Sequence, residues 1–211
     1  MVSVRVGAVV YLLAAQYFVA EQLTAAAWRD PDYSWAHNYI SDLGLLTCSP
    51  EACSPRHALM NASFLVLGAT IATGSVLLRN QLRAGNLRRV AVGLLVASGV
   101  GDLLVGSFPG SVADASGSNL AHTTGAVLAI VGGNAGILAT GLLLRRGRHR
   151  RLAIYSITSG MVGLAAFALF GLDVDLGLGT GTIERIAANP ITVWMVVVGA
   201  LTLRSAGRSR G

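Results

Sequence analysis

Apolar residues occur along the chain in six long stretches that are separated by shorter polar segments. Each stretch has about 20 residues, the length at which a helix crosses the roughly 30 Å hydrocarbon core of a bilayer. The strands of a membrane barrel are shorter, at about 10 residues, and alternate between apolar and polar positions. The pattern therefore predicts transmembrane helices, and these cover residues 4–27, 57–78, 90–109, 121–144, 152–171 and 186–203.

Charged residues separate the two ends of these predicted helices. All sixteen basic residues are Arg, and most lie in the loops 79–89 and 145–151 or close to the chain ends. The acidic residues outside the helices lie in the other loops. Because cytoplasmic loops are enriched in basic residues, both termini are predicted to be cytoplasmic and residues 28–56 to form an external loop. The predicted fold class is an all-α bundle of six transmembrane helices.

The composition agrees with this assignment and narrows the class of partner. Hydrophobic residues make up 53% of the chain and charged residues 12%, against about 25% charged residues in a soluble domain. The formal charge of +6 does not indicate a nucleic-acid partner, because the Arg residues lie in short loops between apolar helices. We predict a single membrane-embedded domain in the bilayer of a cell inner or plasma membrane. Its oligomeric state stays open.

The first apolar stretch could instead be a cleaved secretory signal. Arg5 precedes it and the small residues 25–27 follow it. A signal core has about 7 to 15 apolar residues, however, and this stretch is longer and contains Glu21. We expect it to be a retained helix, since cleavage would leave five helices and an external N-terminus.

The two cysteines of the chain, Cys48 and Cys53, both lie in the predicted external loop. In an oxidising compartment they could close a small disulfide ring. A zinc site is less favoured, because structural zinc takes four ligands at recognised spacings and only two thiols are present. The spacing therefore predicts a disulfide that constrains the loop.

Glu21 and Asp102 are the acids that fall inside the predicted membrane core. Such groups are costly there and usually face the bundle interior or water, which makes each a candidate functional residue. At about 1.5 Å per residue, both lie roughly 10 Å below the outer ends of their helices, at the level of Asn61. No basic residue lies near them in the predicted helices, so they must stay protonated or reach water. The alternative is a structural hydrogen bond to a neighbouring helix, which is favoured for Asn61.

Further polar and aromatic positions lie near this level. Tyr17, Glu21 and Trp28 follow one stripe of the first helix at helical spacing. His57 and Asn61 share a face of the second helix for the same reason. Together with residues at the outer ends of the later helices, they could line one pocket that opens outward. The later residues are Asp102, His122 and Asn189.

The predicted external loop carries aromatic residues such as Trp35 and Tyr39, which favour the headgroup region. We expect the loop to lie on the membrane or to fold over the mouth of the bundle. Asp42 could cap a short helix there. Alternatively, Asp42 could pair with one of three histidines, which are His37, His57 and His122.

Four short features together resemble a family of bacterial and archaeal membrane proteins, the domain of unknown function 998. They are NYISDLG at 38–44, Asn61, GSFPG at 106–110 and His122. The resemblance implies a six-helix membrane protein with its marked residues near the outer helix ends, and it implies no settled activity. The matching positions are Ser41, Asp42, Asn61, Pro109 and His122. The chain departs from the pattern after Pro109, because the next acid comes only at Asp114, which puts a role for such an acid in doubt.

These features favour a membrane-embedded enzyme that performs acid–base chemistry on a lipid or isoprenoid substrate. A carboxyl in apolar surroundings can stay protonated at neutral pH and act as a general acid. Proton-initiated cyclisation of a prenyl chain is one such reaction, with aromatic walls to stabilise a cation. The predicted catalytic residues are Glu21, Asp42, Asp102 and His122. The predicted substrate-binding residues are Tyr17, Trp28, Trp35, Tyr39, His57, Asn61 and Asn189.

Two other functions are open from the sequence. His57, His122 and Asp42 could hold a metal ion that activates water for lipid hydrolysis, although no predicted helix carries HxxxH or HExxH. A non-catalytic scaffold or transporter subunit is the other alternative, and it would tolerate the loss of the intramembrane carboxyls. The chain has no recognised cofactor motif, so no cofactor is predicted.

Overall fold

The computed structural model describes residues 2–29, 31–48, 53–110, 118–145, 147 and 149–208. Within these ranges the secondary structure is entirely helical. Six helical stretches are long and apolar enough to cross a membrane, namely Ser3–Ala25, His57–Gln81, Asn86–Ser107, Asn119–Leu144, Arg150–Gly171 and Thr180–Gly207. The predicted all-α, six-helix fold is confirmed, and the chain is a multi-pass membrane protein.

Three of the six spans are built from more than one helical segment. The elements are α1 (Val2–Leu12), η1 (Leu13–Ala15), α2 (Gln16–Ala25), η2 (Ser41–Gly44), α3 (His57–Leu78), η3 (Arg79–Gln81), α4 (Asn86–Ser107), α5 (Ser118–Val127), η4 (Leu128–Gly132), α6 (Gly133–Leu144), α7 (Arg150–Gly171) and α8 (Thr180–Arg208). The first span runs continuously from α1 through η1 to α2, the second from α3 into η3, and the fourth from α5 through η4 to α6.

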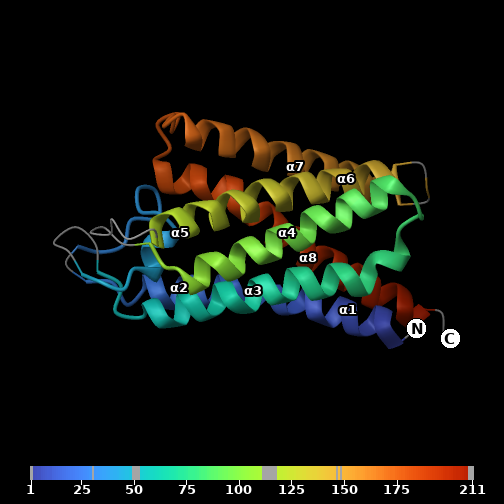
Figure 1. Ribbon diagram of the computed structural model, residues 1–211, viewed down its shortest axis with the longest axis horizontal. Helices are drawn as coiled ribbons and strands as arrows, with labels where there is room; N and C mark the ends of the chain where they lie inside the picture. The colour runs from blue at the N-terminus through green and yellow to red at the C-terminus, as the bar shows by residue number, and fades with distance from the viewer. Residues whose placement is uncertain are drawn as a thin grey trace.

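The six spans form a closed ring. Each packs against its neighbours in the sequence, and α1 packs against α8 to complete the circle. Both termini lie at one end of the bundle (Figure 1), which we call the terminal end. The opposite end, where α2, α4 and α7 finish, is called the loop end. Large side chains such as Ile71, Ile137 and Met195 are fully buried between the spans.

Glycines allow the second and third spans to approach closely. A Cβ atom built on Gly68 of α3 would lie 2.4 Å from the carbonyl oxygen of Gly99, and one built on Gly99 would lie 2.5 Å from that of Gly68. The two helix backbones are therefore in direct contact. Small residues serve this purpose in membrane bundles, because apolar side chains gain little by leaving lipid for another helix.

The fourth span contains a π-helical segment, η4, at mid-membrane depth. The Ser98 hydroxyl of α4 donates a hydrogen bond of 2.8 Å to the carbonyl oxygen of Ala129 in this segment. A π segment turns the following residues relative to an ordinary α-helix, and such segments are frequent at functional sites. Its position directs attention to the space between α4 and η4.

The sixth span starts at Thr180 rather than near residue 186 as predicted. Glu184 and Arg185 therefore belong to the helix and not to the preceding loop. Hydropathy ended the predicted span at these two charges, but both side chains point into protein contacts rather than into water or lipid. Ahead of the helix, the positive φ angles of Gly177 and Gly179 reverse the chain direction.

Candidate functional site

A cavity of about 310 Å³ lies at the loop end of the ring. This volume falls near the lower end of ligand pockets, which span roughly 300–1,000 Å³. All six spans contribute to its wall, and residues 39–41 of the outer loop form its roof. Aliphatic and aromatic side chains make up most of the lining, and its polar or ionisable side chains are Tyr17, Tyr39, Ser41, Asp102, His122, Thr123, Glu184 and Thr192.

Asp102 is the acid on the α4 side of this cavity. Its side chain lies one turn above Ser98, next to the π segment, and only 8% of the residue is exposed. Across the part of the chain that the structure describes, its carboxyl has no hydrogen-bond or ion-pair partner. Burial of an isolated carboxylate is costly, so this carboxyl must be neutral or must meet a ligand or water from the cavity.

Glu184 is the acid on the α8 side, and it connects the cavity wall to the roof. Its Oε2 atom accepts a hydrogen bond of 2.5 Å from the backbone N–H of Ile40. Glu184 is buried and lines the cavity. Glu184 was predicted to lie in a loop and was not predicted as a site residue, because the last span was predicted to begin only near residue 186. Once the helix is known to begin at Thr180, Glu184 lies one turn before Ala188, which also lines the cavity.

Arg185 holds the outer loop and does not itself line this cavity. Its Nε donates to Glu21 Oε1 at 3.0 Å, and its Nη1 donates to the carbonyl oxygens of Trp35 at 3.0 Å and Asn38 at 3.1 Å. Its Nη2 donates to the hydroxyl of Tyr33. The guanidinium also lies 4.9 Å from the centre of the Trp35 ring, a cation–π contact. One side chain thus joins α2, α8 and the loop.

The premise that neither intramembrane acid has a basic partner is wrong for Glu21. Arg185 forms an ion pair with it, and Glu21 does not line the cavity. The error follows from the predicted start of the last helix, which left Arg185 outside the membrane. Glu21 therefore has a structural partner, and the acid chemistry predicted for it has no geometric support.

Tyr33 and Trp28 make further contacts that hold the loop. The Tyr33 hydroxyl donates to the Tyr39 carbonyl oxygen at 2.8 Å, and burial raises the pKa of this phenol despite the nearby Arg185. The Trp28 ring packs edge-on against Tyr33 with centroids 5.0 Å apart. Trp28 and Trp35 were predicted to bind substrate, but both lie outside the cavity and pack the loop instead.

Asp42 lies inside the short η2 turn and bonds Tyr39, which precedes the turn. Its Oδ2 accepts a hydrogen bond of 2.8 Å from the backbone N–H of Tyr39. Burial raises the pKa of the Asp42 carboxyl, and its hydrogen bonds from Tyr39 and Asn38 offset part of the rise. In the described residues Asp42 bonds no histidine, so the predicted pairing with His37, His57 or His122 is not formed. The predicted cap is not formed either, because the N-cap residue of η2 is Ile40 and no side chain caps it.

Asn61 and Gly44 fix the end of the same turn. The Asn61 Nδ2 donates to the Gly44 carbonyl oxygen at 2.9 Å, and a Cβ at residue 44 would lie 2.3 Å from Asn61 Oδ1. A side chain at residue 44 would displace Asn61, so this hydrogen bond requires glycine at position 44 and an amide at position 61. Neither Asn61 nor His57 lines the cavity, and the substrate binding predicted for them stays a prediction.

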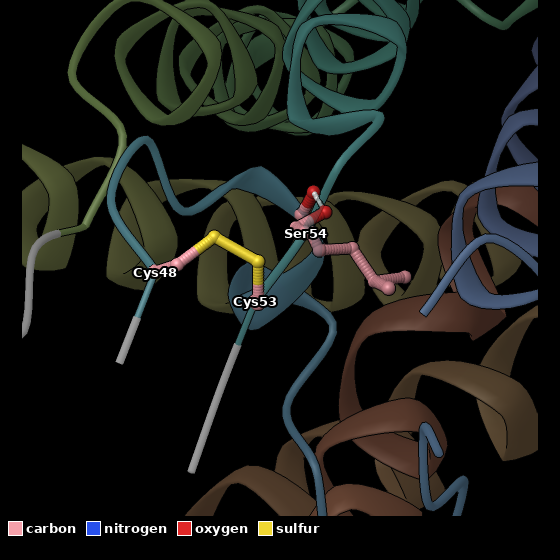
Figure 2. Close-up of a disulfide and its surroundings, with 4 residues drawn as sticks. Cys48, Cys53 and Ser54 are labelled. Carbon is pink, nitrogen blue, oxygen red and sulfur yellow. Dashed lines mark hydrogen bonds between the residues drawn. A yellow bond between two sulfur atoms is a disulfide. The ribbon is translucent and has the colours of Figure 1, made fainter. Parts of the chain in front are cut away.

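Nearby, a disulfide closes the outer loop. Cys48 and Cys53 are joined, with Cα atoms 4.2 Å apart, and the Ser54 hydroxyl donates to the Leu43 carbonyl oxygen at 2.6 Å (Figure 2). Leu43 is fully buried. The ring therefore sits directly beside the η2 turn, whose first residue, Ser41, is part of the cavity roof.

His122 stands at the α5 side of the cavity. Its Nδ1 donates to the carbonyl oxygen of Phe108 at 3.0 Å, which ties the start of the fourth span to the end of the third. A carbonyl oxygen can only accept, so in a neutral ring the other nitrogen, Nε2, is left as an acceptor. Of the predicted site residues, the structure brings four together around the cavity, namely Tyr17, Tyr39, Asp102 and His122.

Asn189 belongs to a different depression. It lines an open groove between α7 and α8, together with Tyr155, Arg185 and Pro190. Its Oδ1 atom is buried and has no hydrogen-bond partner in the described residues. Asp114 and the stretch 111–117 lie outside the described residues.

The described residues contain no cluster of three or more His, Cys, Asp or Glu side chains that could hold a metal ion. The alternative ligand set of His57, His122 and Asp42 is therefore not assembled, because Asp42 is committed to the η2 turn and His57 does not reach the cavity.

Comparisons with known proteins bear on the family alone. The model of a family described as "Protein of unknown function (DUF998)" matches residues 6–201, which is most of the chain. The resemblance inferred from the SDLG turn, Asn61, the Phe-Pro pair and His122 is thus confirmed. Searches of curated proteins and of solved structures give no significant match.

Proposed function

The chain belongs to the DUF998 family of proteins of unknown function, and we propose that it is a membrane-embedded enzyme that performs acid–base chemistry on a lipid-like substrate. The observation that carries this proposal is Asp102, an unpartnered and buried carboxyl on the wall of a largely apolar cavity. Glu21, the other intramembrane acid predicted to be catalytic, is left out of the proposal because it pairs with Arg185 and does not line the cavity.

Asp102 is the proposed general acid. A carboxyl that has no partner in an apolar cavity favours its neutral form, and a neutral carboxyl can donate a proton. Apolar walls keep water from the reacting atoms, which strengthens each polar contact inside. The substrate class that fits is a lipid or isoprenoid, since the cavity is lined mainly by aliphatic and aromatic side chains.

His122 is the proposed proton acceptor. Its Nδ1–H is held by Phe108, so the acceptor nitrogen Nε2 is free to take the proton that the cationic intermediate loses as the product forms. Tyr17 and Tyr39 supply aromatic surface in the lining of the same cavity. Asp42 acts indirectly, by holding the turn that carries Ser41 and Tyr39.

The Asp102→Asn variant tests the proposal. The amide keeps the shape of the side chain but cannot donate the same proton, so turnover should fall by about 10²- to 10⁴-fold. The measurement is mass spectrometry of products after incubating purified protein in liposomes with isoprenoid alcohols, isoprenoid hydrocarbons and acyl lipids. Asp173→Asn is the matched control, because Asp173 is an exposed acid at the same end of the bundle.

Either of two results would count against an Asp102-dependent enzyme. One is the absence of any product from the wild-type protein across these substrates. The other is turnover by Asp102→Asn equal to that of Asp173→Asn. The non-catalytic scaffold would then be the better account of the chain.

We also propose that the terminal end of the bundle faces the cytoplasm. Arg5, Arg79, Arg88 and Arg204 gather near this end, as the positive-inside rule requires of a cytoplasmic face. The disulfide lies at the opposite end, in keeping with an oxidising exterior. A C-terminal fluorescent-protein fusion should be bright and a C-terminal alkaline phosphatase fusion inactive. The reverse pattern would show the inverted topology.

A further inference from the structure

Two acidic side chains face the cavity. Asp102 lines it from α4 and Glu184 from α8, and the only other titratable side chains among the described lining residues are His122 and two tyrosines. None of the described residues that line it is Lys or Arg. Arg185, next to Glu184 in sequence, does not line the cavity, and its side chain bonds Glu21 and the loop.

Asp102 distinguishes this arrangement from a chance cluster of acids. The residue is more than nine-tenths buried, at 8% exposure, yet its carboxyl has no partner in the described part of the chain and faces the cavity. Glu184, in contrast, already accepts a hydrogen bond from the Ile40 N–H through Oε2. The cavity thus offers one unengaged carboxyl and one half-engaged carboxyl on facing helices.

Aromatic rings add a second source of attraction for positive charge. Tyr39 and Phe170 meet edge-on at the roof with centroids 5.6 Å apart, and Tyr17 and Phe64 lie 6.0 Å apart on the wall. All four line the cavity. The face of an aromatic ring attracts a cation through its quadrupole, and the attraction is stronger where water is excluded.

We infer that the cavity binds an apolar chain whose reacting or polar end carries or develops a positive charge, and that it rejects chains that end in phosphate. This inference rests on the proposed function, because it names the substrate class of the same cavity. A phosphate group placed there would face Asp102 and Glu184 and would find no basic side chain among the described lining residues. An uncharged isoprenoid that becomes a carbocation on protonation fits the inference, and so does an alkyl ammonium that mimics such a cation.

Three probes that share one ten-carbon prenyl chain test the inference. Geranylamine is cationic, geraniol is neutral, and geranyl phosphate is anionic. Binding to the full-length protein in a non-ionic detergent is measured from the shift in thermal unfolding against probe concentration. We expect geranylamine to bind about tenfold more tightly than geraniol, and geranyl phosphate to give no shift.

Two variants connect the charge preference to the cavity. In Asp102→Asn and in Glu184→Gln the ratio of geraniol to geranylamine dissociation constants should fall toward one, while Asp173→Asn should keep the wild-type ratio. Comparison of this ratio between variants also cancels the partition of each probe into micelles, since that partition is the same for every variant. Equal or tighter binding of geranyl phosphate by the wild-type protein would overturn the inference, as would a ratio that Asp102→Asn leaves unchanged.

Failure of this inference and failure of the proposed function give different results. A charge preference that depends on Asp102, without turnover of any isoprenoid, would leave a cation-binding protein and remove the enzyme. Turnover that depends on Asp102, with the phosphate-bearing probe bound best, would keep the enzyme and remove the substrate class.

Discussion

Replacement of Arg185 by Met should lower the free energy of unfolding by about 3–5 kcal/mol, the usual cost of removing one partner of a buried ion pair. Glu21 would be left as a buried carboxylate without a cation, since its side chain is only 4% exposed. The loop would also lose the donors that hold Trp35 and Asn38. Thermal unfolding in detergent measures the stability, and limited proteolysis reports the release of the loop.

A double variant separates the charge from the contacts. Glu21→Gln added to Arg185→Met removes the isolated charge, so part of the lost stability should return. The loop should stay sensitive to protease, because its contacts with Trp35 and Asn38 need the guanidinium. Arg185→Lys should be intermediate, since an ammonium keeps the charge but cannot spread its donors over several acceptors. Wild-type stability and protease resistance in Arg185→Met would show that the outer loop is held by other contacts.

The Arg185 contacts also show where sequence reasoning stopped. Hydropathy is a local property averaged over a window, so it located the six spans and the loop between the first two. The same average ended the last span at Glu184 and Arg185, because it counts a charge as exposed. Whether a charge is exposed depends on a partner such as Glu21, which is far away in the sequence. Pairings of this kind are decided by tertiary packing.

Part of the cavity lining could be predicted because the depth of a residue in the membrane, unlike its pairing with a distant residue, is a local property of the sequence. The count of residues to the helix end gives the depth of a side chain, and this count placed Asp102 near the level of Asn61. Depth does not give the direction in which a side chain points. Trp28 packs against Tyr33 of the loop, and neither Trp28 nor His57 lines the cavity. Rotation of a helix about its axis is set by close contacts between helices.

One such contact gives a second prediction with a large effect, at Gly101 in α4. A Cβ there would lie 2.4 Å from the Ala129 nitrogen and 2.5 Å from the Gly125 carbonyl oxygen. Both are backbone atoms of the fourth span, so no side chain can rotate to make room. Gly101→Ala should push α4 away from η4 and lower the free energy of unfolding by about 1–3 kcal/mol.

Gly93, on the same helix, provides a matched control. A Cβ built there meets no atom within 4 Å, so Gly93→Ala should leave stability unchanged or slightly higher, as alanine favours the helix. Because Asp102 adjoins Gly101, Gly101→Ala should also weaken geranylamine binding, whereas Gly93→Ala should not. Thermal unfolding with and without the probe measures both effects. Equal behaviour of the two variants would show that the contact between α4 and η4 does not shape the cavity, and the position of Asp102 would then need another cause.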